Sequence, residues 1–246
     1  SSGVAVSRRR ILLPVLAASV VTAIAIGAAA WALRPNPPAP VVTQFDFALP
    51  EGQSFSGGSR QNVAISPDGT KIAYLANGRL YVRSMRELEP KAIAGIDNDP
   101  TLLNPMFAPD GESIVFFAQT ELKRIPVSGG TASTIAMLGA TPFGFSWSAE
   151  GILVGQGPGG IVRVSAAGGV PEPLVSVATD EWAYGPQMLP GSRTLIYTLA
   201  KGSDEERWDK AQIVAHSLVD GTKSMLIEAA SDARYLPTGH LVYSVS

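Results

Sequence analysis

Two segments of the sequence place acidic and aromatic residues close together. "VATDEWAYG" contains Asp180, Glu181, Trp182 and Tyr184, and "AKGSDEERWDKA" contains Asp204, Glu205 and Trp208. Aromatic rings offer large contact areas, and carboxylates accept hydrogen bonds and attract cations, so such a group favours recognition of a ligand or partner. A third segment, "GIDNDPTLLN", adds Asp97 and Asp99. We expect a binding surface formed by the acidic and aromatic residues of the first two segments: Asp180, Glu181, Trp182, Tyr184, Asp204, Glu205 and Trp208. The alternative is that Trp182 and Tyr184 pack internally while the acidic run is solvated.

The same sequence offers little for catalysis. His216 lies in the apolar run "QIVAHSL" and His240 follows a turn glycine, so neither belongs to a Ser-His-Asp or metal-ligand pattern. The chain has no cysteine. The glycine-rich "GQGPGG" at 155–160 is not followed by a helix that could hold a phosphate. We therefore expect no catalytic residues, no metal, no cofactor and no enzyme activity in this chain.

A repeated turn indicates which elements position the candidate residues. Ser66-Pro67-Asp68-Gly69 has the chemistry of a tight turn, and Asn77-Gly78 shortly afterwards is a strong hairpin signal. The run between them is apolar at successive positions, as expected for a strand in a sheet covered on both faces. Related turns recur every 40 to 48 residues, with their glycines at 69, 111, 151, 191 and 239.

A period of about 40 to 45 residues carrying four strands is typical of a β-propeller blade. The expected fold is all-β, a partial propeller of four-stranded antiparallel blades, with four blades and one strand of a fifth. The units run over about 61–95, 103–138, 143–176 and 185–229, with the fifth starting at about 232. The alternation of Phe45, Phe47 and Leu49 predicts one more strand before the first blade.

Blade four has about 11 residues more than blades two and three, and the surplus is "AKGSDEERWDKA", between its second and third strands. Because strands alternate in direction, this insertion opens on the same face as the connections between blades. It would therefore meet "VATDEWAYG".

The segments "SPDGTKIAYLANGRLYVRSM" and "APDGESIVFFAQTELKRIPVSGG" resemble the WD-like repeats of TolB-type periplasmic propellers. The order of an apolar run, a proline-rich linker and a propeller, with "RVSAAGGVPEPL" and "ARYLPTGHLVYS", also resembles the sensor half of bacterial transmembrane serine/threonine protein kinases. The chain contains none of the kinase motifs themselves. That resemblance implies a catalytic domain on the N-terminal side, outside this sequence.

Residues 11–33 are uncharged and apolar, and as a helix they would extend about 34 Å, enough to cross a bilayer. Arg8, Arg9 and Arg10 precede them, so we expect residues 1–10 to be cytoplasmic, 11–33 a transmembrane helix and 34–43 a stiff linker. Residues 44–246 would then form the partial propeller outside the inner membrane, in the periplasm or beyond. A cleaved export signal at 11–33 is the alternative, and it puts the propeller on the same side.

The formal net charge is −2, and without the three arginines at 8–10 the rest of the chain is more acidic. A mildly acidic chain without a cluster of basic residues is a poor candidate for binding nucleic acid. The sequence thus predicts an extracytoplasmic propeller sensor that binds a small molecule or a protein, in a membrane-anchored serine/threonine kinase. The alternatives are a TolB-like periplasmic scaffold and the propeller of a prolyl-oligopeptidase-like hydrolase.

Overall fold

The computed structural model describes residue 22 and residues 47–56, 61–96 and 98–245. The chain divides into two units, 1–48 and 49–246, and the fold described below is that of the second. The segments expected at 1–10, 11–33 and 34–43 lie outside the described residues, apart from Thr22. Over the residues that are described, the helical structure is too short to traverse a bilayer.

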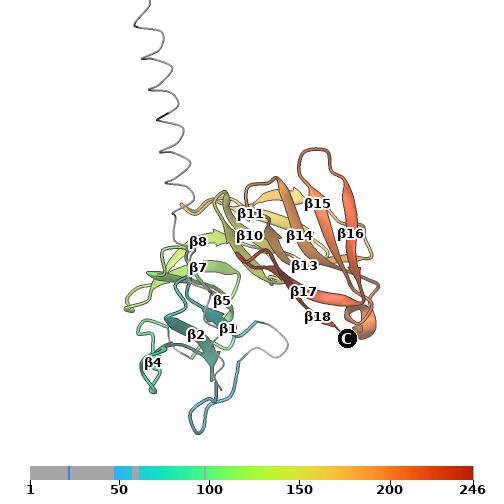
Figure 1. Cartoon of the computed structure of the whole chain (residues 1–246). Helices are drawn as coiled ribbons and strands as arrows, with labels where there is room; N and C mark the ends of the chain where they lie inside the picture. The colour runs from blue at the N-terminus through green and yellow to red at the C-terminus, as the bar shows by residue number, and fades with distance from the viewer. Residues whose placement is uncertain (1–21, 23–46, 57–60, 97, 246) are drawn as a thin grey trace, which may run out of the picture. The chain divides into compact units, whose positions relative to one another are not determined.

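The second unit consists of four antiparallel four-stranded sheets and one hairpin, which follow one another in chain order (Figure 1). The first blade contains β1 (Val63–Ile65), β2 (Lys71–Ala76), β3 (Arg79–Ser84) and β4 (Lys91–Ala92). The second contains β5 (Leu103–Phe107), β6 (Ser113–Ala118), β7 (Glu121–Pro126) and β8 (Ser133–Met137). The third contains β9 (Phe145–Ser148), β10 (Gly151–Gly155), β11 (Ile161–Val164) and β12 (Glu172–Val175). The fourth contains β13 (Glu181–Met188), β14 (Thr194–Lys201), β15 (Gln212–Ser217) and β16 (Lys223–Glu228). The hairpin that follows consists of β17 (Ala230–Tyr235) and β18 (Leu241–Val245). The four predicted blades are confirmed.

The first strands of successive blades contact one another: β1 meets β5, β5 meets β9, β9 meets β13, and β13 meets β17. These strands therefore lie on the inner side of the arc of blades. Within each blade the remaining strands follow outward in sequence order. This is the blade order of a propeller.

The middle strands are apolar on both faces because each sheet lies between two others. In β6, Ile114 and Phe116 pack in the core shared with blade one, whereas Val115 and Phe117 pack in the core shared with blade three. All four side chains are at most 2% exposed. The doubly apolar runs of the sequence thus have the cause that was predicted for them.

The Pro-Asp-Gly turn that opens the first blade is held by its own side chains. The carboxylate of Asp68 accepts hydrogen bonds from Ser66 Oγ at 2.6 Å and from the backbone N–H and hydroxyl of Thr70 at 3.0 and 2.7 Å. These bonds hold the pKa of Asp68 well below its usual range. Gly69 adopts φ +70°, which a residue with a side chain rarely adopts.

Two expectations about strand boundaries are wrong. The described part of the strand expected around Phe45, Phe47 and Leu49 has no regular structure at 47–50. Pro50 and Gly52 turn the chain there, with Gln53 N–H bonded to Pro50 O, and the pairing with β2 comes instead at Phe55, opposite Ala76.

The fifth unit contains two strands rather than one. The turn at Leu236-Pro237-Thr238-Gly239 joins β17 to β18, and Gly239 N–H donates to Leu236 O at 2.9 Å. The sequence placed this turn correctly, but the strand before it, "ASDARY", lacks the apolar run of its counterparts. Its buried members are only the small residues Ala230 and Ala233.

Candidate functional site

The insertion of blade four occupies residues 202–211, between β14 and β15, as the sequence predicted. In blades one and two the same connection needs only two residues, Asn77-Gly78 and Gln119-Thr120. The insertion contains the short 3₁₀ helix η1 (Glu205–Trp208), a feature that was not predicted. Gly202 N–H donates to Asp180 O at 2.9 Å and joins the insertion to the connection between blades three and four.

The helix η1 places Trp208 against aromatic residues of two neighbouring segments. Trp208 lies nearly parallel to Phe143, with ring centroids 6.3 Å apart, and meets Tyr184 edge-on at 5.8 Å. Phe143 also contacts Trp182 edge-on at 5.5 Å. These four rings come from the blade 2–3 connection, from β13 and from the insertion. Edge-on and offset contacts of this kind stabilise an aromatic cluster beyond its buried area.

The rings surround a cavity of about 520 Å³, which we call the aromatic pocket; it is lined by Phe143, Trp182, Tyr184, Arg207, Trp208, Ser231 and Asp232. All lining side chains except that of Asp232 are half-buried. The pocket is therefore open to a ligand while its rings are held by neighbours. Its size is within the range of small-molecule sites.

Gly157, in the glycine-rich segment 155–160, allows the rings to approach. It has φ +58°, and a Cβ placed on it would lie 2.8 Å from Trp182 and 2.9 Å from Phe143. Its N–H and carbonyl also pair with Ala183 of β13. The glycine-rich segment thus serves close packing beneath the aromatic pocket.

Arg207 is the cation of the pocket. Its guanidinium carbon lies over the ring of Trp182 at 4.5 Å and over the ring of Trp208 at 5.6 Å. Nη1 donates to Asp204 O at 2.7 Å. Nε is buried and has no hydrogen-bond partner among the described residues.

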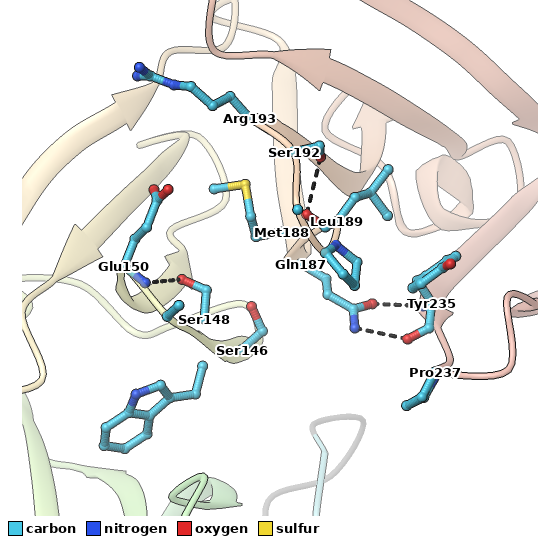
Figure 2. A pocket seen from close by; sticks show the side chains of 14 residues that line it. Ser146, Ser148, Glu150, Gln187, Met188, Leu189, Ser192, Arg193, Tyr235 and Pro237 are labelled. Atoms are coloured by element: carbon cyan, nitrogen blue, oxygen red, sulfur yellow. Dashed lines mark hydrogen bonds between the residues drawn. The ribbon is translucent and has the colours of Figure 1, made fainter. Parts of the chain in front are cut away.

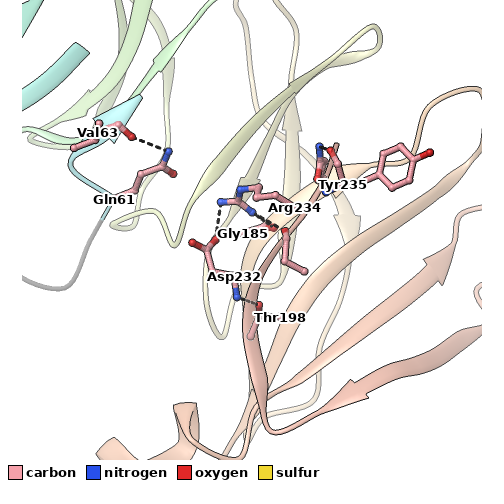
Figure 3. Close-up of polar contacts among 9 residues, drawn as sticks. Gln61, Val63, Gly185, Thr198, Asp232, Arg234 and Tyr235 are labelled. Carbon is pink, nitrogen blue, oxygen red and sulfur yellow. Dashed lines mark hydrogen bonds and ion pairs between the residues drawn. The ribbon is translucent and has the colours of Figure 1, made fainter. Parts of the chain in front are cut away.

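Asp232 also lines the pocket and is held by a polar network that Figure 3 shows. Its N–H donates to Thr198 Oγ1 at 2.9 Å, and its Oδ1 pairs with Arg234 Nη2 at 2.8 Å. Arg234 Nη1 in turn donates to Gly185 O at 3.0 Å. Asp232 has φ +50°, a conformation that costs free energy for a residue with a side chain and that the network maintains.

The structure brings together three of the seven predicted site residues, Trp182, Tyr184 and Trp208. Glu181 does not join them, because its side chain points into blade four; the residue is only 9% exposed. Its carboxylate accepts the N–H of Ala178 at 3.1 Å and lies 3.2 Å from Lys201 Nζ and 3.9 Å from Lys223 Nζ. Burial raises the pKa of Glu181, but the hydrogen bonds from Ala178 and Lys201 and the charge of Lys223 outweigh it, so the pKa lies below its ordinary value.

The other acidic candidates contribute backbone groups or lie apart. Asp180 and Asp204 are exposed and use their carbonyl groups to hold Gly202 and Arg207. Glu205 is the first residue of η1. The carboxylate of Asp99 accepts the N–H and hydroxyl of Thr101, and Asp97 lies outside the described residues.

Four pocket residues escaped prediction: Phe143, Arg207, Ser231 and Asp232. Phe143 lies in the blade 2–3 connection, the counterpart of the segment that supplies Trp182, and this equivalence could have indicated it. Arg207 is adjacent to Trp208 in sequence. Ser231 and Asp232 start the fifth unit, where the sequence pattern is weakest.

A second depression, of about 1,000 Å³, lies at the other ends of the strands (Figure 2). It is lined largely by the turns of blades three and four and of the hairpin, including Glu150, Arg193 and Pro237. Gln187 at its floor bonds both backbone groups of Tyr235, at 3.0 and 2.7 Å, and so fastens β13 to β17. Because most of its lining belongs to turns and strand ends that every blade requires, we place the candidate site at the aromatic pocket.

No arrangement typical of a catalytic or metal centre is seen in the part of the chain that the structure describes. No group of three potential ligands could hold a metal ion there. His216 is buried in β15, with its pKa lowered by burial and by Lys223, and His240 bonds Thr238 within its turn.

No protein-family model matches the sequence, and no curated protein matches it. Among solved structures, the chain is similar to TolB from Acinetobacter baumannii, with 16% identity and a TM-score of 0.58 over 76% of this chain and 48% of that one. It is also similar to the hydrazine synthase of Kuenenia stuttgartiensis, with 14% identity and a TM-score of 0.55 over 80% and 59% of the two chains. An oligogalacturonate lyase in complex with manganese gives 13% identity and a TM-score of 0.53 over 75% and 58%.

These similarities show the fold, a TolB-like propeller of four-stranded antiparallel blades, and confirm that part of the prediction. The chain spans about half to three-fifths of the length of these structures.

Proposed function

We propose that this chain is a binding module, in which the propeller holds the aromatic pocket rigid and the pocket takes a small molecule or a side chain of a partner protein. The observation that carries the proposal is the insertion at 202–211. It adds residues that the sheet does not need, and it contributes Arg207 and Trp208 to the pocket. Loops on a rigid scaffold are the usual place for binding residues.

We propose that this chain binds its ligand without catalysis of its own, because the pocket lining shows no nucleophile paired with a general base. Its wall consists of four aromatic rings, one guanidinium, one hydroxyl and one carboxylate. The carboxylate is paired with Arg234, and the guanidinium faces two indoles. The carboxylate therefore offers a polar contact to a ligand beside the rings.

A thermal-shift screen of amines, amino acids, carboxylates and sugars tests the proposal with two tryptophan variants. Trp208→Ala removes a wall of the pocket, while Trp147→Ala removes a tryptophan that stacks on Arg124 and lines the depression on the opposite face. We expect compounds that raise the melting temperature of the wild type and of Trp147→Ala but not of Trp208→Ala. A screen in which no compound depends on Trp208 would contradict the proposal.

We further propose that the module is the extracytoplasmic sensor of a membrane-anchored serine/threonine kinase, with residues 11–33 as the anchor. Support comes from the resemblance in sequence order and from the arginines before residue 11. The fold alone fits a TolB-like scaffold or a hydrolase propeller equally well, so the test is the flanking coding sequence. Kinase motifs upstream favour the sensor, whereas a downstream Gly-x-Ser-x-Gly motif favours the hydrolase. For the location, alkaline phosphatase fused after residue 246 should be active if the propeller is outside the cytoplasm.

A further inference from the structure

Arg207 occupies the aromatic pocket in the manner of a bound cation. Its guanidinium carbon lies 4.5 Å and 5.6 Å from the ring centroids of Trp182 and Trp208. The negative face of an indole attracts a cation, and Trp is the best of the aromatic residues for this contact. The pocket thus already accommodates a planar organic cation, supplied by its own loop.

Arg207 is poorly satisfied in this position. Among the described residues, its Nε is buried without a hydrogen-bond partner, and Nη1 has one bond, to the carbonyl of Asp204 in the same loop. None of the ion pairs found among the described residues includes Arg207. An unpaired buried donor costs free energy, so little beyond the two indoles holds the guanidinium where it is.

The carboxylates around the pocket favour a cation as well. Asp232 lines the pocket with a side chain that is 46% exposed, and among the described residues only its Oδ1 is paired, with Arg234. Asp180 and Asp204 lie close in sequence to Trp182 and Trp208; both are exposed, and neither takes part in an ion pair among the described residues. Exposed carboxylates near the pocket favour the approach of a cation over that of an anion.

Resting on the proposed function, we propose that the ligand of the aromatic pocket is an organic cation, a guanidinium or quaternary ammonium group, and that Arg207 is the internal competitor it displaces. Displacement moves Arg207 out toward Asp180 and Asp204, where its donors can be hydrated. The ligand cation then faces Trp182 and Trp208, and the carboxylate of Asp232 supplies the opposite charge. The apparent affinity is reduced by the fraction of molecules in which Arg207 fills the site.

The test uses two cations and their neutral isosteres, with binding followed by tryptophan fluorescence of the full chain. Choline is compared with 3,3-dimethylbutan-1-ol, and methylguanidinium with methylurea, and acetate serves as the anion. We expect at least one cation to bind at least about tenfold more tightly than its isostere, because the charge carries the contact with the rings. If the cation binds in the aromatic pocket, Trp208→Ala should abolish this binding and Trp147→Ala should leave it unchanged.

Arg207 variants test the competition. Arg207→Gln removes the charge and shortens the side chain, so the preferred cation should bind this variant about threefold to tenfold more tightly than the wild type. Arg207→Lys keeps a competing charge and should remain closer to the wild type. The inference is overturned if neither cation is preferred to its isostere, if Arg207→Gln weakens cation binding, or if acetate binds in a manner that requires Arg207. A neutral or anionic compound whose effect depends on Trp208 would overturn this inference and leave the proposed function intact.

Discussion

Blades two and four are built on the same plan and differ in one loop. In both, the second strand is buried on its two faces, and Phe116 and Tyr197 occupy the same position, the fourth residue of β6 and of β14. In blade two the next turn needs only Gln119 and Thr120, which bond the neighbouring connections through Thr101 Oγ1 and Leu138 N–H. In blade four, residues 202–211 replace this turn, and the pocket forms there. The strands therefore form the cores between blades, and the inserted loop contributes Arg207 and Trp208 to the pocket.

The largest expected effect is on the strand side of this comparison. Phe116 is 1% exposed and packs between blades one and two. Phe116→Ala should lower the free energy of unfolding by about 3–5 kcal/mol, through lost burial and the cavity left behind. Chemical denaturation measures this. A loss below 1 kcal/mol would show that the blade cores do not determine stability.

A smaller effect is expected at Glu181, which precedes Trp182 but belongs to the strand side. Glu181→Gln should cost about 1 kcal/mol or less near neutral pH, because the partner lysines are partly exposed and solvent weakens the pairs. The sign of the pH dependence follows from the lowered pKa. The contribution of the carboxylate is present above its ordinary value of 4.5 and is lost as the pH falls through the lower, folded-state value.

The wild type should thus lose stability more steeply than Glu181→Gln as the pH falls below about 4.5, in thermal unfolding followed by circular dichroism. Parallel curves would indicate that Glu181 is not paired in solution. Binding at the aromatic pocket should be unchanged in the variant, which separates Glu181 from its neighbour Trp182.

An effect of similar size and opposite sign is expected where the second strand of blade four is made to match that of blade two. The hydroxyl of Tyr197 is buried and has no hydrogen-bond partner within the described residues, and burial raises its pKa to about 12. Tyr74, at the same position of blade one, donates instead to Gln53 at 2.9 Å. Tyr197→Phe should therefore stabilise the fold by about 1 kcal/mol, whereas Tyr74→Phe should not. Destabilisation by Tyr197→Phe would indicate that its hydroxyl binds an internal water.

The blades could be predicted from the sequence because each one repeats the same local chemistry: a turn with Pro-Asp-Gly character, a doubly apolar strand and a second glycine turn. The position of the insertion could be predicted for the same reason, since it interrupts a counted period. The prediction of a strand around Phe47 was wrong, because alternating apolar residues do not by themselves provide a neighbouring strand to pair with. The chain turns at Pro50, and its first pairing with β2 comes at Phe55. Glu181 was misplaced because strand β13 begins at that residue and turns its side chain into blade four, while the ring of Trp182 faces the pocket.

Arg207, Asp232 and Phe143 depend on contacts between segments far apart in sequence. No local pattern shows that a 3₁₀ helix at 205–208 would lay a guanidinium over Trp182, or that Asp232 would reach the pocket from the fifth unit. The sequence contains these residue types, but which of them come into contact depends on how successive blades pack.

The central claim is that the insertion forms a binding site and is dispensable for the fold. The most direct test shortens residues 202–211 to an Asn-Gly turn, the connection found in blade one, and measures thermal unfolding together with the titration of choline and methylguanidinium. We predict that the free energy of unfolding falls by no more than about 3 kcal/mol, the contribution of one large buried side chain, since closure entropy changes only slightly with loop length. The cation binding seen in the intact chain should be lost. A shortened chain that unfolds far more easily, or one that still binds the cation, would contradict the account.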